Sequence, residues 1–213
     1  IDKQNQGFYA SAGAYSFDGE NVVSNSMTQL GVGVFWRIKE TTESSLRVGL
    51  DIDSFTYDKN LSFHTFGHGG YFSPQSYINI GVPIKWSGES GQLSYGIDAK
   101  IGFERFTQDD VDFFPGNAAL QLQLEELAQT ASEPQLTQHR GSSDTGVSIS
   151  LRGEMVYQVS PKLSLGSSVL IQSSGDYDES RIGLFARYFF APQTARLSQP
   201  ADQSDILVTQ RGL

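Results

Sequence analysis

The chain has 213 residues, 22 of them glycine and none cysteine, and its formal net charge is −9. This length suits one β domain of ordinary size, and the absence of cysteine excludes disulfides and thiolate metal sites. The negative charge argues against a nucleic-acid partner, because phosphate binding needs clustered Lys and Arg, and no run of ~18 apolar residues is present that could form a transmembrane helix.

The N-terminal residues IDKQNQGFYASAG lack the basic and apolar regions of a signal peptide. We therefore expect either that a signal has been removed or that the chain is a fragment. Beyond them the sequence alternates strictly: the even positions from Leu30 to Ile38 are all apolar, whereas the odd ones hold Gly, Phe and Arg. Such alternation predicts strands with one apolar face. We count about eight, at 7–17, 29–38, 46–53, 77–86, 93–104, 146–158, 163–172 and 181–190.

Three details favour an outer-membrane β-barrel over a soluble β-sandwich, which would also alternate. The segments run for about ten residues, near the length that crosses a bilayer at a tilt. Glycine is frequent on the polar faces, as expected where backbones crowd inside a closed barrel. Short links alternate with long ones, as periplasmic turns alternate with extracellular loops. The short links are 39–45, 87–92 and 160–162, and the long ones are 57–76 and 105–144.

We therefore expect residues 1–190 to form an all-β, antiparallel, up-and-down transmembrane barrel in a bacterial outer membrane. Trp36, Trp86 and Tyr188 fall near the short-turn ends, where an aromatic girdle would lie. The last strand ends on Phe190, and this form resembles the C-terminal signal by which such barrels are recognised for assembly. The remaining segment, 191–213, is polar and punctuated by proline, so we expect a disordered tail. The alternative is that it folds back into the lumen.

Three segments carry a resemblance to a known family. They are FTYDKNLSFHTFGHGGYFSPQSY (55–77), GVPIKW (81–86) and FTQDDVDFFP (106–115). These segments resemble the C-terminal domain of cellulose synthase operon protein C, the outer-membrane export subunit of bacterial cellulose secretion. The YDKNL and GGYFSPQSY blocks are long and unusual, and a looser likeness extends from Gly7 to Phe190. The resemblance implies a porin-like barrel through which an elongating β-1,4-glucan leaves the periplasm.

The resemblance also implies partners. They are the cellulose chain, the outer-membrane lipids, a periplasmic tetratricopeptide region and the inner-membrane cellulose synthase complex. This chain shows no helical repeats of its own. The family's barrel has sixteen strands, so the eight found here are expected to be its C-terminal half. A closed eight-stranded barrel is filled by its own side chains and could not pass a sugar chain. We therefore expect that 7–17 and 181–190 are not hydrogen-bonded to each other.

The loop 57–76 carries the candidate glycan contacts. Aromatic rings offer flat apolar faces to pyranose C–H surfaces, and hydroxyl and amide groups can bond sugar hydroxyls. Gly67, Gly69 and Gly70 permit tight turns or movement in this loop. The candidates are Tyr71, Phe72, Ser73, Gln75, Ser76 and Tyr77. The alternative is that these aromatic side chains pack the loop against the rim of the barrel.

The strand register predicts which side chains line the pore. Mixed-sign charges on neighbouring strands are expected to pair and stiffen the wall, and together with occasional rings they would leave a wetted track for a neutral polymer. The expected lining is Phe35, Arg37, Arg47, Asp51, Asp53, Phe55, Asn79, Lys85, Asp98, Lys100, Glu104, Arg152, Glu154, Arg181, Phe185 and Arg187, together with Tyr77 of the loop set.

The connection 105–144 is too long to be a mere link. Within it, NAALQLQLEELAQTA places Asn117 as an N-cap and leucines at helical spacing, which predicts a short amphipathic helix. Such a helix, on the extracellular side or folded into the pore, could gate the channel. The alternative is a surface loop that shields the rim.

An enzymatic function has little support. His64, His68 and His139 are the only histidines, and the glycines beside the first two argue against a helical metal site. The stretch GSSDTG at 141–146 lacks the context of a nucleophile elbow. We expect no catalytic residues, no metal and no cofactor. Two less favoured functions stay open: a small self-contained barrel acting as an anchor or adhesin, and a barrel enzyme acting on lipids.

Overall fold

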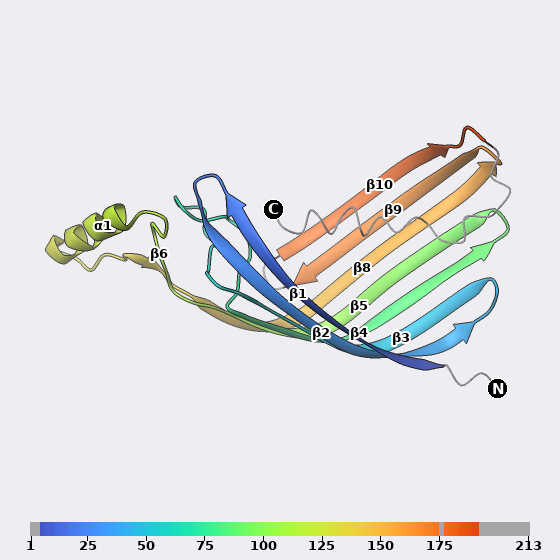
Figure 1. Ribbon diagram of the computed structural model, residues 1–213, viewed down its shortest axis with the longest axis horizontal. Helices are drawn as coiled ribbons and strands as arrows, with labels where there is room; N and C mark the ends of the chain where they lie inside the picture. Colours follow the sequence, from blue (N-terminus) through green and yellow to red (C-terminus); the bar gives the residue numbers. More distant parts are fainter. Residues whose placement is uncertain (1–4, 175–176, 192–213) are drawn as a thin grey trace.

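The protein is built around one curved antiparallel sheet of eight strands (Figure 1). The structure, a computed structural model, describes residues 5–174 and 177–191. Neighbouring strands follow the order β1-β2-β3-β4-β5-β8-β9-β10. Their bounds are β1 (Gln6–Gly19), β2 (Val22–Glu40), β3 (Ser44–Tyr57), β4 (Ser76–Ser90), β5 (Leu93–Gln108), β8 (Ser142–Ser160), β9 (Leu163–Ser174) and β10 (Tyr177–Tyr188). The predicted all-β antiparallel meander is confirmed, whereas the predicted tail lies outside the described residues.

Two further strands and a helix interrupt the meander between β5 and β8. The strands β6 (Val111–Asp112) and β7 (Gln138–His139) pair with each other, and α1 (Ala118–Thr130) lies between them in the chain. The described residues thus form ten strands, not the eight that alternation predicts, because two-residue strands are too short to show a period. Among these residues no helix has both the length and the apolar character that a membrane span requires.

The strands are longer than the predicted ten residues. The eight strands of the main sheet range from 12 residues in β9 and β10 to 19 in β2 and β8. The ladder of β5 with β8 continues to Gln108 and Ser142, where both faces are polar. Backbone pairing does not need an apolar face, so the pattern ends before the strand does. The long connections are therefore 58–75 and 109–141, shorter at both ends than predicted.

Tight turns close the hairpins at both ends of the sheet. Glu20 and Asn21 join β1 to β2, and Asn21 has a φ of 60°. This left-handed conformation is tolerated by asparagine and is typical of two-residue hairpin loops. Gly91, with a φ of 61°, occupies the same conformation in the turn from β4 to β5. The β2–β3, β4–β5 and β8–β9 turns lie at one end of the sheet, and the long connections lie at the other (Figure 1).

The two faces of the sheet have opposite polarity, and the apolar one is uncovered. Leu30 and Phe103 on the apolar face are 62% and 72% exposed, whereas Glu104 on the polar face is 2% exposed. Among the described residues, no helix or second sheet packs against the apolar face. The register confirms the expected faces: Leu30, Val48, Ile80, Ile97, Ile149 and Leu184 on the apolar face, and Asp51, Asp98 and Arg152 on the polar face.

The sheet does not close on itself. β1 pairs only with β2, and β10 pairs only with β9, so each has one edge without a neighbour among the described residues. The expectation that 7–17 and 181–190 are not hydrogen-bonded to each other is therefore confirmed. The described chain is an open curved sheet.

Candidate functional site

The polar face is the concave face of the sheet. Lys100 on β5 reaches past β4 to β3, where its Nζ lies 2.7 Å from Asp51 Oδ1 and 2.5 Å from Asp53 Oδ2. Strands two apart are separated by about 9.6 Å, so side chains that bridge them must converge over the strand between. Gly81 occupies that intervening position on β4 and leaves room for the lysine. Side chains converge in this way on a concave surface.

The same arrangement recurs along the face. Asn79 on β4 crosses Gly102 to donate a 2.5 Å hydrogen bond to Ser148 Oγ on β8. A Cβ at Gly102 would lie 2.6 Å from Asn79 Oδ1, so glycine is required there for the crossing. Tyr77 and Ser174 both donate to Glu104 Oε2, at 2.6 and 2.7 Å. These contacts join β4, β5, β8 and β9 through their inward side chains.

The cross-strand register puts every residue predicted to line a pore on this one face. The predicted pairing of charges is seen for only some of them. Lys100 pairs with two aspartates, and Lys85 pairs with Asp98 at 3.4 Å. Arg47 instead lies over the ring of Phe35, with its Cζ 5.6 Å from the centroid.

The connection 58–75 folds inward over the polar face at the long-loop end. Tyr71 packs against Phe17 and Tyr57, with ring centroids 6.1 and 5.7 Å away. Its hydroxyl accepts a 3.0 Å hydrogen bond from Asn25 Nδ2. Leu61 in the same connection is fully buried. The connection is thus a docked structure with its own small core.

The candidate glycan contacts, in this connection and at the start of β4, have different environments. Ser73 is fully buried, and its hydroxyl accepts a 2.7 Å hydrogen bond from the backbone N–H of Leu61. Tyr77 stacks on Phe55 with centroids 4.2 Å apart. Ser76 is exposed, and the side chain of Phe72 is 42% exposed. The ring of Phe72 is therefore accessible to a ligand, whereas the hydroxyl of Ser73 is not.

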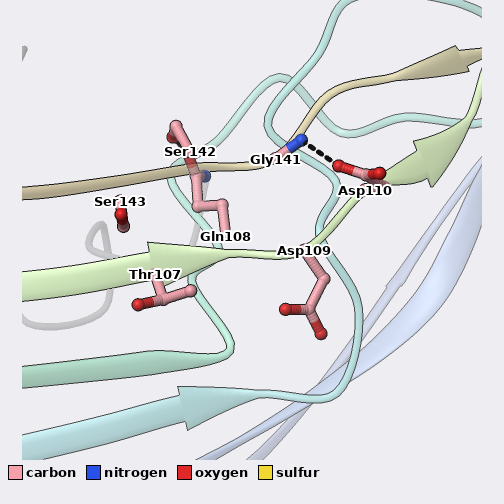
Figure 2. Close-up of a pocket in the computed structure, with 7 residues that line it drawn as sticks. All are labelled: Thr107, Gln108, Asp109, Asp110, Gly141, Ser142 and Ser143. Atoms are coloured by element: carbon pink, nitrogen blue, oxygen red, sulfur yellow. Dashed lines mark hydrogen bonds between the residues drawn. The ribbon is translucent and has the colours of Figure 1, made fainter.

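Gln75 ties the connection to the base of a projecting arm. Its Oε1 accepts a 2.8 Å hydrogen bond from the backbone N–H of Asp109. Here a shallow polar hollow opens between the ends of β5 and β8 (Figure 2). Its lining is Thr107, Gln108, Asp109, Asp110, Gly141, Ser142 and Ser143. Gly141 donates its N–H to Asp110 Oδ1 at 2.6 Å, which closes the base of the arm.

The arm carries α1 beyond the ends of the strands (Figure 1). The predicted N-cap is confirmed, since Asn117 Oδ1 accepts a 3.1 Å hydrogen bond from the N–H of Leu120. Leu122 and Leu127 of α1 are exposed. The helix does not lie over the concave face, so of the two predicted positions the structure has the outer one.

Two histidines dock the connection 58–75 onto the arm. His68 Nε2 donates to the carbonyl oxygen of Asp112 at 3.0 Å, and His139 stacks on Phe63 with centroids 3.9 Å apart. His139 Nε2 also lies 2.9 Å from Thr65 Oγ1. The Nδ1 of His68 is buried and has no hydrogen-bond partner among the described residues. Burial lowers the pKa of His68, and burial together with the neighbouring His68 lowers the pKa of His139.

Docking of this connection is expected to weaken in acid. Because both histidine pKa values are lowered in the docked state, the undocked state binds protons more readily. Docking should be complete above about pH 6.5, the ordinary histidine pKa, and should be lost as the pH falls below it. Hydrogen exchange of amides in 58–75, corrected for intrinsic rates, should show falling protection between about pH 7.5 and 5.5. The control is His64→Gln, because His64 is exposed and makes none of the docking contacts of His68 and His139; this variant should show the same pH response as the wild type. Protection that stays constant across this pH range in the wild type would contradict the prediction.

Several residues that shape this site carry no strong signal in the sequence. Tyr9 on β1 donates a 3.1 Å hydrogen bond from its hydroxyl to Asp51 Oδ2, across Gly33 of β2. Asn25 accepts from the N–H of Lys59 and holds the start of the connection. Alternation places Tyr9 on the polar face, but it does not show that a side chain spans two strands.

The sequence of the chain is similar to the sequences of one family of known proteins. The family model described as Cellulose synthase operon protein C C-terminus matches residues 1–191. The cellulose synthase operon protein C of Pseudomonas fluorescens (strain SBW25) is 30% identical over 199 residues, which cover 93% of this chain and 15% of that protein. The protein of that name from Xanthomonas axonopodis pv. citri (strain 306) is 35% identical over 190 residues, covering 85% and 13%. The chain thus spans about one seventh of the length of these relatives.

Proposed function

The chain belongs to the family of the cellulose synthase operon protein C C-terminus, and from this premise we propose that it forms part of an outer-membrane channel that exports an exopolysaccharide. The name shared by its relatives supports a role in bacterial cellulose synthesis. Cellulose, a β-1,4-glucan, is therefore the proposed cargo. The proposed partners are the cellulose chain, the outer-membrane lipids, and the periplasmic and inner-membrane parts of the cellulose synthase machinery.

The opposite polarity of the two faces carries this proposal. Large apolar side chains such as Leu30, Phe103 and Leu184 are exposed across the convex face. A contiguous apolar surface of this kind is rare on a soluble monomer, and it suits the hydrocarbon of a bilayer. Trp36 and Trp86 lie on the same face near the short turns, where an aromatic girdle would meet the headgroups.

The open edges indicate how such a channel would be completed. In lipid every backbone polar group needs a partner, so unpaired edges on β1 and β10 cannot face hydrocarbon. The chain spans about one seventh of its relatives, and the rest of such a protein could supply the adjoining strands. Those strands would widen the lumen beyond that of an eight-stranded barrel, whose interior is filled by side chains.

The concave face suits a neutral polymer in transit. Several of its most buried polar groups are engaged with each other, as in the contacts of Lys100 with Asp51 and of Tyr77 with Glu104. Groups that already bind one another compete less for sugar hydroxyls, and weak binding is what conduction requires. The exposed ring of Phe72 at the long-loop end offers a stacking surface for a pyranose.

Blocking the concave face tests the proposal. A Cβ at Gly96, on the polar face of β5, would meet no atom within 4 Å. Gly96→Cys in the full-length protein should therefore assemble normally and accept a bulky polyethylene-glycol maleimide. Labelling should abolish cellulose secretion from living cells, because the polymer and the label would occupy the same space.

Leu122→Cys provides the control, since Leu122 is 56% exposed on α1, which projects beyond the ends of the strands. A label there should leave secretion unchanged once the barrel has assembled. Normal secretion by the labelled Gly96→Cys protein would refute export through this face.

A further inference from the structure

A row of basic side chains crosses the polar face in a single register. Arg37 on β2 is directly opposite Arg47 on β3, which is opposite Lys85 on β4. The same row continues from Lys85 through Asp98, Arg152 and Leu170 to Arg181 on β10. Five of its seven members are cations. We call Arg37, Arg47, Lys85, Arg152 and Arg181 the basic row.

Arg181 forms an ion pair with Glu179, whereas the other four cations of this row are at most partly neutralised. Among the described residues no carboxylate lies within 4 Å of Arg47 or Arg152. Lys85 pairs with Asp98, but both side chains are more than half exposed, so water screens the pair. The closest carboxylate contact of Arg37 is Nε to Glu40 Oε2 at 3.9 Å, beyond hydrogen-bond distance.

Like charges in direct cross-strand opposition destabilise a sheet. Here Arg37 faces Arg47, and Arg47 faces Lys85, so three cations stand side by side. Arg47 is held in place by the ring of Phe35, not by an acid. The arrangement keeps positive charge directed into the concave space.

The basic row is inclined along the proposed conduit. Arg37 lies three residues before the end of β2 at Glu40, and Arg152 lies eight residues before the end of β8 at Ser160. Both strands end at the short-turn side of the sheet. Because a strand advances about 3.3 Å per residue, the row climbs by about 16 Å between these strands. It therefore forms a track toward the long-loop end, not a ring at one level.

The rest of the chain has the opposite charge. The formal net charge is −9, and the long connections are rich in acids. They carry Asp58, Asp109, Asp110, Asp112, Glu125, Glu126 and Glu133, against Lys59 and Arg140. The positive row is thus a local feature of the concave face, and it does not follow from a basic composition.

We propose that the basic row makes the conduit selective for anions and gives it affinity for oxyanions such as carboxylate and phosphate groups. Guanidinium groups match the geometry of these oxyanions, and rows of Arg and Lys favour anions in other pores. An anionic substituent on a passing polymer would be drawn along the track. This inference rests on the proposed function, since it requires that the concave face line a pore.

The test is the reversal potential of the full-length protein in a planar bilayer under a tenfold KCl gradient. The wild type should show a chloride-to-potassium permeability ratio above one. The double variant Arg47→Gln with Arg152→Gln should bring this ratio close to one, and the Glu double variant should invert it. Added inorganic phosphate should reduce the chloride current of the wild type and should have less effect on the Gln variant.

Matched controls separate the row from general charge effects. Arg105→Gln removes a cation from the convex side of β5, where Arg105 is exposed, and should leave the ratio unchanged. Arg47→Lys keeps the charge and should retain the preference, which guards against a folding defect. A conducting wild type that prefers potassium would overturn the inference alone. A correctly assembled protein that neither conducts nor exports polymer would overturn the proposed function as well.

Discussion

Lys100→Met is expected to destabilise the protein by about 2–4 kcal/mol, as does the loss of one partner from a buried ion pair. Lys100 Nζ lies between Asp51 and Asp53 and joins β5 to β3. The side chain of Asp51 is only 7% exposed, so its charge cannot be solvated when the lysine is removed. Asp53 is 35% exposed and contributes less, because water reaches it. The hydroxyl of Tyr9 would be the remaining donor to Asp51.

The measurement is the urea dependence of unfolding of the full-length protein in lipid vesicles, followed by the loss of its compact form on unheated gels. Lys85→Met is the matched control, because it removes the same charge from the same face. Lys85 and Asp98 are 71% and 53% exposed, so this change should cost at most about 1 kcal/mol. Adding Asp51→Asn and Asp53→Asn to the Lys100 variant should restore part of the stability. Equal effects of the two methionine substitutions would show that Lys100 has no special role.

The sequence predicts the faces of this sheet well and its extent less well. Period-two alternation assigns Leu30 and Asp51 to opposite faces because successive side chains must point to opposite sides of a strand. It stops at Glu104 on β5 because Phe106 puts an apolar ring on the polar face, whereas the backbone pairing with β8 continues to Gln108. The lengths of the strands therefore depended on pairing that a local pattern does not record.

The contacts within the candidate site were harder to predict for a related reason. Lys100 and Asp51 are 49 positions apart in the chain and two strands apart in the sheet, and their contact depends on a glycine between them. The sequence singles out the aromatic residues of 58–75 only as a group. Whether each ring packs or stays exposed depends on partners such as Asn25 and Phe17, which come from another hairpin.

The connection 58–75, and not the α1 arm, is expected to narrow the mouth of the channel. Tyr71 packs on Phe17 and Tyr57, which belong to the concave face, so this connection extends over the conduit. It is held there by the backbone hydrogen bond from Val23 N–H to the carbonyl oxygen of Gly67 at 2.9 Å. The arm that carries α1 projects beyond the strands instead (Figure 1).

Replacing residues 60–73 by a short Gly-Ser turn in the full-length protein should raise its single-channel conductance severalfold, because the docked connection occupies the conduit at its long-loop end. The matched control removes α1 (Ala118–Thr130) and joins its ends by an equally short linker. That deletion should leave the conductance unchanged, since the helix does not cover the concave face. Both variants must first show the compact form of an assembled barrel on unheated gels. If the α1 deletion widens the channel and the 60–73 replacement does not, the arm must fold back over the mouth in the membrane and act as the constriction.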